Sequence, residues 1–133
     1  MSRVLSFIAV LMIVLAGAGS ALAQGPITPQ HSDPFWQAAY WNNMTLSGSP
    51  ALQRTDSNLD FSWGLGSPDP SIQADGFSAR WARYLDLEAG TYRFAATSDD
   101  GMRVYVNSEL IIDDWSDHSA RTVTADKYLV GGT

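Results

Sequence analysis

The chain has 133 residues, enough for one domain, and it carries 14 acidic against 8 basic side chains, a net charge of −6 at pH 7. Such a surface repels phosphate backbones and anionic membranes, which excludes nucleic acid as a partner and leaves sugars, proteins and divalent cations. The absence of cysteine excludes a disulfide scaffold, a thiolate zinc site, a cysteine nucleophile and a lipidated cysteine.

Residues 1–23 have the three parts of a secretory signal. Arg3 provides the positive start, Val4 to Ala16 is apolar except for one serine, and Ala21-Leu22-Ala23 is an A-x-A cleavage site. A membrane anchor is the alternative, but the apolar run is shorter than the roughly 17–25 residues of a spanning helix. We therefore expect a signal-peptide helix that is cleaved after Ala23. The mature chain would carry a net charge of −7, would be secreted, extracellular or at the cell surface, and would have no membrane association.

The mature chain is predicted to consist of a linker and one β domain. Residues 24–34 hold three prolines and show no apolar periodicity, which is typical of a linker. From residue 35 onward apolar and polar residues alternate with period 2, turn clusters separate the alternating segments, and no window has a helical stripe. The pattern predicts an all-β domain over residues 35–133, an antiparallel sandwich or barrel, with Trp63 and Trp81 in the core and a slip near Ala82. Strands are expected at residues 35–43, 59–63, 77–85, 92–96, 102–106, 110–112, 121–124 and 127–130.

Several segments of this domain occur in a characteristic order. They are Ser62-Trp63-Gly64, Phe77-Ser78-Ala79-Arg80-Trp81, Leu87 to Phe94, Ser98-Asp99-Asp100-Gly101 followed by Met102 to Val106, and Ile111 to Trp115. The ordered set resembles the PA-14 module, the β-barrel domain named after the anthrax protective antigen, which also occurs in bacterial glycosidases and yeast flocculin-type adhesins. The resemblance covers nearly the whole chain from residue 35 onward and implies the same barrel fold.

The chain departs from this family at its end. The family's barrel continues beyond the position of Gly131-Gly132-Thr133, so we expect the domain to lack its closing strands. Residues 127–130 would then form an exposed edge strand, which favours edge-to-edge association.

Asp99-Asp100-Gly101 is the first candidate site, and the resemblance implies that both aspartates bind calcium and, through it, sugar hydroxyls. Calcium takes six to eight oxygen ligands. Adjacent side chains on a regular strand point to opposite faces, so the two carboxylates can share an ion only where the backbone leaves strand geometry. In the adhesin branch of the family a cis peptide between two such aspartates does this, and Gly101 would allow a tight turn. Alternatively, the three residues are simply good turn formers.

Asp113-Asp114-Trp115 and His118 form the second candidate site. Trp115 could offer a ring face to a sugar, with Asp114 or His118 bonding its hydroxyls; alternatively, Trp115 packs over the mouth of the barrel. The chain has two histidines and no G-x-S-x-G, so the inventory for a Ser-His-Asp hydrolase or a zinc enzyme is poor, and we expect no catalysis.

The sequence thus predicts a secreted, non-catalytic, lectin-like carbohydrate-binding module with a calcium-dependent glycan site at the Asp-Asp-Gly loop. The alternatives are a structural or protein-interaction module of the bacterial cell surface, or a fragment of a larger glycosidase or adhesin.

Overall fold

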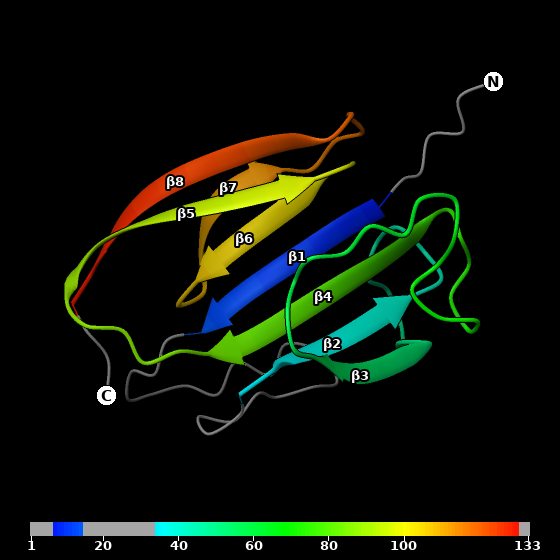
Figure 1. The fold of residues 1–133 in the computed structure, drawn as a ribbon, viewed down its shortest axis with the longest axis horizontal. Helices are drawn as coiled ribbons and strands as arrows, with labels where there is room; N and C mark the ends of the chain where they lie inside the picture. The colour runs from blue at the N-terminus through cyan, green and yellow to red at the C-terminus, as the bar shows by residue number, and fades with distance from the viewer. Residues whose placement is uncertain (1–6, 15–33, 131–133) are drawn as a thin grey trace.

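A computed structural model describes residues 7–14, by their backbone, and residues 34–130 (Figure 1). All regular structure in these ranges is β, which confirms the predicted all-β class. None of the described residues forms a helix long and apolar enough to cross a membrane. The strands are β1 (Phe7–Val14), β2 (Trp36–Trp41), β3 (Leu52–Asp56), β4 (Phe77–Tyr84), β5 (Gly90–Ser98), β6 (Met102–Val106), β7 (Glu109–Asp114) and β8 (Arg121–Leu129).

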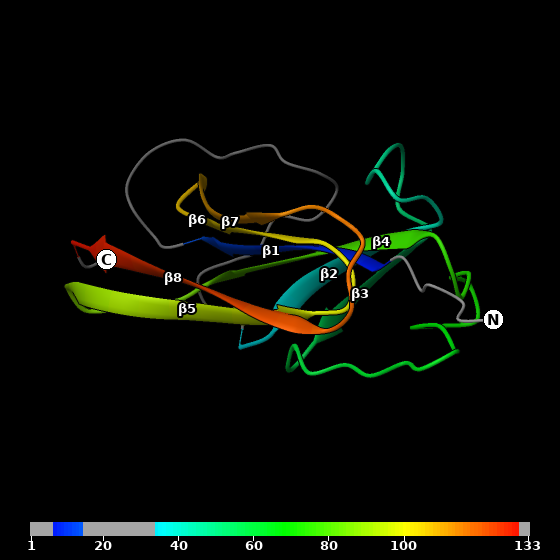
Figure 2. The same cartoon turned by 90° about the horizontal axis from the view of Figure 1, so that it is seen from above.

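The strands form two sheets. The larger has the order β3-β2-β4-β1-β6-β7, and the smaller pairs β5 with β8. Neighbouring strands are antiparallel except that β1 runs parallel to both β4 and β6. Figure 2 shows the two sheets as layers, with β5 and β8 lying over the half of the large sheet that contains β6 and β7.

Strand β1 corrects the expectation of a signal-peptide helix. Phe7–Val14 lies in the centre of the large sheet, and its Ala9 stands opposite Ala79 of β4 and Met102 of β6. A run rich in valine, isoleucine and leucine suits a parallel strand that is covered on both faces, and the same run suits a signal peptide. Cleavage after Ala23 stays a prediction. Most of the expected linker, and the Gly131-Gly132 turn, lie outside the described residues.

Two further expectations about the strands are wrong. Residues 59–63 belong to the loop between β3 and β4, while the short polar strand β3 was missed. The alternation of Leu59 and Trp63 arises because both side chains pack from this loop onto the sheet. The pairing of β4 is continuous through Ala82, and the irregularity lies in the β6–β7 pairing, where Val104 and Tyr105 pair with Ile112 and Leu110 and Ile111 is skipped.

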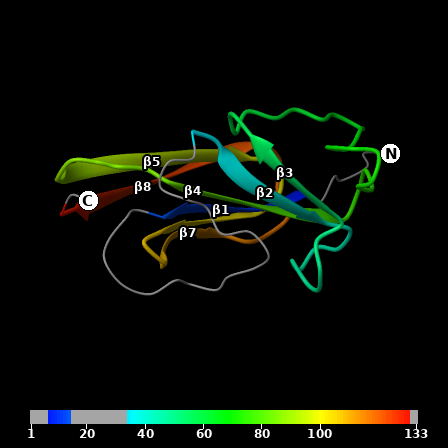
Figure 3. The same cartoon turned by 90° about the horizontal axis from the view of Figure 1, so that it is seen from below.

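Most of the core lies on one face of the large sheet and has two covers, while Ala82, with Tyr105 and Trp115, forms a smaller cluster on the other face. Trp81 of β4 and Val104 of β6 stand opposite the same β1 residue, so they share a face. The small sheet covers β6 and β7, where Met102, Val104 and Ile112 meet Ala96, Val123 and Ala125. The loop of residues 57–76 covers β2 and β4, where Tyr40, Phe77 and Trp81 meet Leu59, Trp63 and Ile72. Figure 3 shows the loop and the small sheet on the same side of the molecule, so a seam separates the two covers.

A buried polar network holds the loop of residues 57–76 in place. The carboxylate of Asp56 accepts hydrogen bonds from Tyr40 Oη at 2.7 Å, Trp81 Nε1 at 2.8 Å and Arg54 Nε at 2.7 Å. Arg54 also donates to the carbonyl of Pro68 at 3.0 Å. Burial, and then the bond to Asp56, raise the pKa of Tyr40 well above its usual range. The network therefore anchors the loop to β2, β3 and β4.

Candidate functional site

The Asp-Asp-Gly loop joins β5 of the small sheet to β6 of the large one. Asp100 is fully buried and has a φ of 62°. Its carboxylate oxygen Oδ1 accepts a hydrogen bond from the backbone N–H of His118 at 3.1 Å, and its own N–H donates to the His118 carbonyl at 3.2 Å. Ser98 Oγ donates to the Asp100 carbonyl at 2.6 Å. Asp100 thus ties its loop to the β7–β8 loop, which makes a second crossing between the sheets.

Gly101 is required for the close approach of these two loops. A Cβ at this position would lie 2.7 Å from the backbone nitrogen of Ser116 and 2.9 Å from the carbonyl oxygen of Asp114. The left-handed backbone conformation expected around Gly101 falls on Asp100 instead. Glycine is therefore needed for space and not for the turn itself.

Asp99 has a different environment from Asp100. Its side chain is exposed, and no described residue donates a hydrogen bond to it. The described residues contain no cis peptide bond, so the linkage that the adhesin branch implies between the aspartates is not found. They also contain no group of three or more His, Cys, Asp or Glu side chains that could hold a metal ion. A cation at this loop would have to combine the two aspartates with other oxygens.

Asp114 and His118 lie beside this loop but bind other protein groups. Arg121 donates two hydrogen bonds to the Asp114 carboxylate, one of them from Nε at 2.8 Å. These bonds hold the pKa of Asp114 below its usual range. The His118 ring is 8% exposed; its Nδ1 lies 2.7 Å from the Ser119 carbonyl oxygen. Its Nε2 lies 3.1 Å from Asp114 Oδ2 without hydrogen-bond geometry.

Trp115 is also engaged within the protein. The guanidinium of Arg103 lies 4.7 Å from the centre of a Trp115 ring and bonds Asp113 at 2.8 Å through Nε. Trp115 packs with Tyr105 against Ala82. The structure brings Asp114, Trp115 and His118 next to the Asp99-Asp100-Gly101 loop and gives each an internal partner. Their role in sugar binding stays a prediction.

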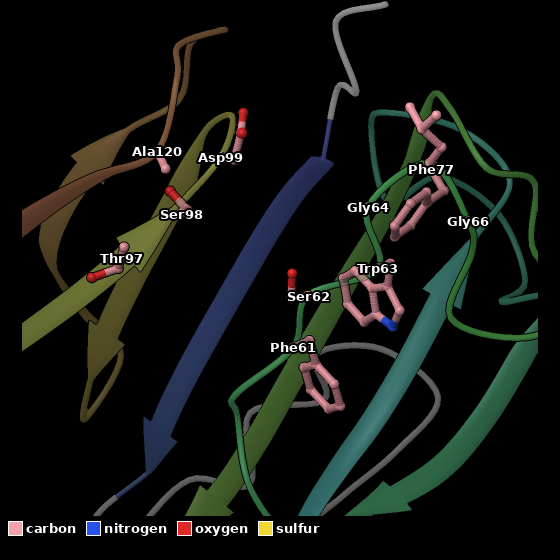
Figure 4. A pocket seen from close by; sticks show the side chains of 11 residues that line it. Phe61, Ser62, Trp63, Gly64, Gly66, Phe77, Thr97, Ser98, Asp99 and Ala120 are labelled. Atoms are coloured by element: carbon pink, nitrogen blue, oxygen red, sulfur yellow. The ribbon is translucent and has the colours of Figure 1, made fainter.

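A pocket of about 510 Å³ opens at the seam between the two covers (Figure 4). One wall is formed by residues 61–66, with Phe77 of β4; the other is formed by residues 97–99 and Ala120. Asp99 is therefore a pocket residue, whereas Asp100 is not. Sequence analysis placed Trp63 in the core and assigned no site role to Phe61, because the alternation was taken for a strand.

Comparison with known proteins places the domain in a family. A family model described as the PA14 domain matches residues 35–133. "Anti-sigma-I factor RsgI3" of Acetivibrio thermocellus is 39% identical over 94 residues, which are 70% of this chain and 14% of that protein. A solved structure described as an "anti-sigma factor domain-containing protein" is 38% identical with a TM-score of 0.65, and the match covers 74% of this chain and 34% of that one. The chain thus spans a minor part of each relative. It belongs to the PA14 domain family, as the ordered segments indicated.

Proposed function

We propose that this domain is an exported, non-catalytic carbohydrate-binding module whose glycan site lies at the Asp99-Asp100-Gly101 loop. The observation that carries the proposal is the position of Asp99, an exposed carboxylate at a pocket of about 510 Å³ in a PA14 domain. Pockets of roughly 300–1,000 Å³ with a few placed polar groups are typical of small-ligand sites. A carboxylate in such a place accepts hydrogen bonds from sugar hydroxyls.

Calcium is the proposed partner of this loop. A carboxylate has about four lone-pair sites, so one carboxylate can both accept a protein hydrogen bond, as Asp100 does from His118, and contact a cation. Asp99 is adjacent and exposed. Calcium needs six to eight oxygens, so backbone carbonyls, waters and sugar hydroxyls would complete its shell. When bound, the ion would supply positive charge for hydroxyl oxygens in a domain of net negative charge.

The relatives suggest the setting in which the module works. Both carry the words anti-sigma factor in their descriptions, and both are much longer than this chain. We propose that the domain is a ligand-receiving unit of a longer exported or cell-surface protein. The signal-like leader supports export.

The test is a melting experiment in calcium chloride and in EGTA. A ligand at 100 times its Kd stabilises the folded state by about 2.7 kcal/mol. For a domain of this size that corresponds to a rise in Tm of about 10–20 °C. We expect the rise in the unmodified chain and its loss in Asp99→Asn. A Tm that is indifferent to calcium would refute the metal site.

The choice of variant matters because Asp100 also holds the two loops together. Asp100→Ala would remove the acceptor for His118 and lower stability without any metal. Asp99→Asn changes an exposed side chain, and Asp75→Asn is its matched control because it removes the same charge from another exposed loop. The control should retain the full calcium response.

A second candidate function is a protein-interaction module that uses β8. Among the described residues β8 pairs with β5 alone, and the side chain of Val130 just beyond it is 85% exposed. Exposed strand edges favour pairing with another chain, and an added charge discourages it. If β8 mediates association, light scattering should show a dimer that Val130→Lys converts to a monomer. A monomer at all concentrations would exclude self-association.

A further inference from the structure

We propose that Phe61 and Trp63 form a second, metal-independent subsite that binds the flat face of a neutral pyranose. This inference rests on the proposed function, because it assumes that the ligand is a glycan. It concerns the pocket wall opposite Asp99, which belongs to the loop of residues 57–76 and not to the Asp-Asp-Gly loop. Figure 4 shows Phe61 and Trp63 on one side of β1 and Thr97, Ser98 and Asp99 on the other.

The aromatic wall is a stack of rings. Phe61 lies parallel to Trp63, with 4.9 Å between ring centres and 11° between planes, and it stacks on Trp81 at 5.8 Å and 20°. Trp63 also meets the edge of Phe77, at 5.7 Å and 75°. Phe61 nevertheless remains 37% exposed, and the neighbouring Leu65 is more exposed still. Water-exposed rings that line a pocket provide apolar area for a ligand.

The buried polar network supports this wall from behind. Trp81 is almost fully buried and donates its ring N–H to Asp56 at 2.8 Å. Arg54 bonds the same carboxylate and lies 5.9 Å from the centre of the Phe61 ring. The rings are therefore held from behind by the buried network, and binding would cost little ordering entropy.

The opposite wall determines which ligand fits. Thr97 Oγ1 is paired with Thr122 at 2.6 Å, and Ser98 Oγ donates to Asp100, so both hydroxyls are engaged. The charged acceptor on this wall is the Asp99 carboxylate. No basic residue occurs among the described residues that line the pocket. A ligand with an acidic group would be repelled in the absence of a cation.

A pyranose with equatorial hydroxyls matches both walls. Its ring C–H groups are weakly positive and attracted to the negative face of an aromatic ring, while its hydroxyls lie around the rim and can donate to a carboxylate. The subsite would therefore select neutral sugars over uronic acids when no metal is present. Calcium at Asp99 would lessen this selection.

The experiment measures binding in EGTA, where the calcium site is inactive. The probes are cellotetraose, xylotetraose and mannotetraose, with tetragalacturonic acid as the acidic comparison, titrated by calorimetry and by tryptophan fluorescence into the full chain. We expect a neutral probe to bind and the acidic probe to bind more weakly. Phe61→Ala and Trp63→Ala, each checked by circular dichroism, should weaken the neutral probe about tenfold or more. Trp63→Phe should keep weak binding but lose the fluorescence response.

Tyr128→Ala is the matched control, because it removes an exposed ring on β8, outside the pocket. Its affinity should equal that of the unmodified chain. The subsite is refuted if no neutral probe binds in EGTA at millimolar concentration, or if Phe61→Ala and Trp63→Ala bind as tightly as the unmodified chain. The calcium proposal fails separately, if adding calcium changes neither Tm nor affinity. If calcium-dependent affinity is unchanged in both Phe61→Ala and Trp63→Ala, the proposed function stands and this subsite is refuted.

Discussion

Replacing Asp56 by alanine should be among the most damaging single changes outside the hydrophobic core. Asp56 is 8% exposed and accepts hydrogen bonds from Tyr40, Trp81 and Arg54. The alanine variant leaves the Tyr40 hydroxyl and the Trp81 N–H buried without this acceptor, at about 1–3 kcal/mol each. Arg54 is 29% exposed, so its unpaired charge adds less. We expect a loss of about 3–5 kcal/mol in the free energy of unfolding.

Urea denaturation followed by tryptophan fluorescence measures this loss. A fall of about 3–5 kcal/mol is a large share of the 5–15 kcal/mol that holds a typical domain, so Asp56→Asn provides a milder second variant. A double-mutant cycle with Tyr40→Phe should show coupling, because the hydroxyl has its main partner in Asp56. Since this network holds the ring stack, Asp56→Asn should also weaken sugar binding in EGTA.

Asp126→Ala is the control for this experiment. Asp126 makes a bidentate ion pair with Arg93, but both side chains are exposed, so we expect a much smaller loss than in Asp56→Ala. Our reasoning about the network would be refuted if Asp56→Ala and Asp126→Ala cost the same, or if Asp56→Ala and Tyr40→Phe were additive.

Three further predictions concern backbone contacts and pH. Gly101→Ala should lower stability by about 1–3 kcal/mol in urea denaturation, because its Cβ would meet the backbone of Ser116. Asp114, whose pKa is lowered by Arg121, stabilises the fold above its unfolded pKa of about 4, and this contribution is lost as the pH falls through the folded pKa. Acid melting should therefore be less steep in Asp114→Asn. Tyr40, whose pKa is raised by burial, stabilises the fold below about pH 10 and loses this effect as the pH rises, so Tyr40→Phe should resist alkali better.

Most of the sheet structure could be predicted from alternation alone. Alternation predicted the strands that the structure confirms as β4 to β7. The two short strands expected at residues 121–124 and 127–130 are instead one continuous strand, β8. Strand β3 was missed because it lies at a sheet edge and consists mostly of polar residues. Its Asp56 is buried and accepts hydrogen bonds from Tyr40 and Trp81 on other strands, which the local sequence does not reveal. The loop of residues 57–76 has a strand-like sequence pattern because its Leu59 and Trp63 side chains both pack onto the sheet.

The environment of the candidate site was not predictable from the sequence. Asp99 and Asp100 are chemically identical in the sequence, yet one lines a pocket and the other is fully buried. The difference depends on His118, which is 18 residues away in the sequence. His118 reaches Asp100 only because the β5–β6 and β7–β8 loops, which both cross between the sheets, lie against each other. The glycine at position 101 is the sequence feature that reflects the close approach of the two loops. A glycine after two aspartates is more simply explained by a turn, so the approach was not predicted.

The leader segment links the fold to the proposed site. Its apolar run suits a signal peptide, yet the structure seats Phe7–Val14 between β4 and β6. Removal on export would leave the facing edges of these strands without backbone partners, which is costly unless another segment takes the position. The two pocket walls stand on either side of this position, one over β4 and one on the small sheet. Glycan affinity should therefore differ between the full chain and a chain beginning at Gln24, although neither wall changes in sequence. Equal affinities would show that the two loops alone fix the spacing of the walls.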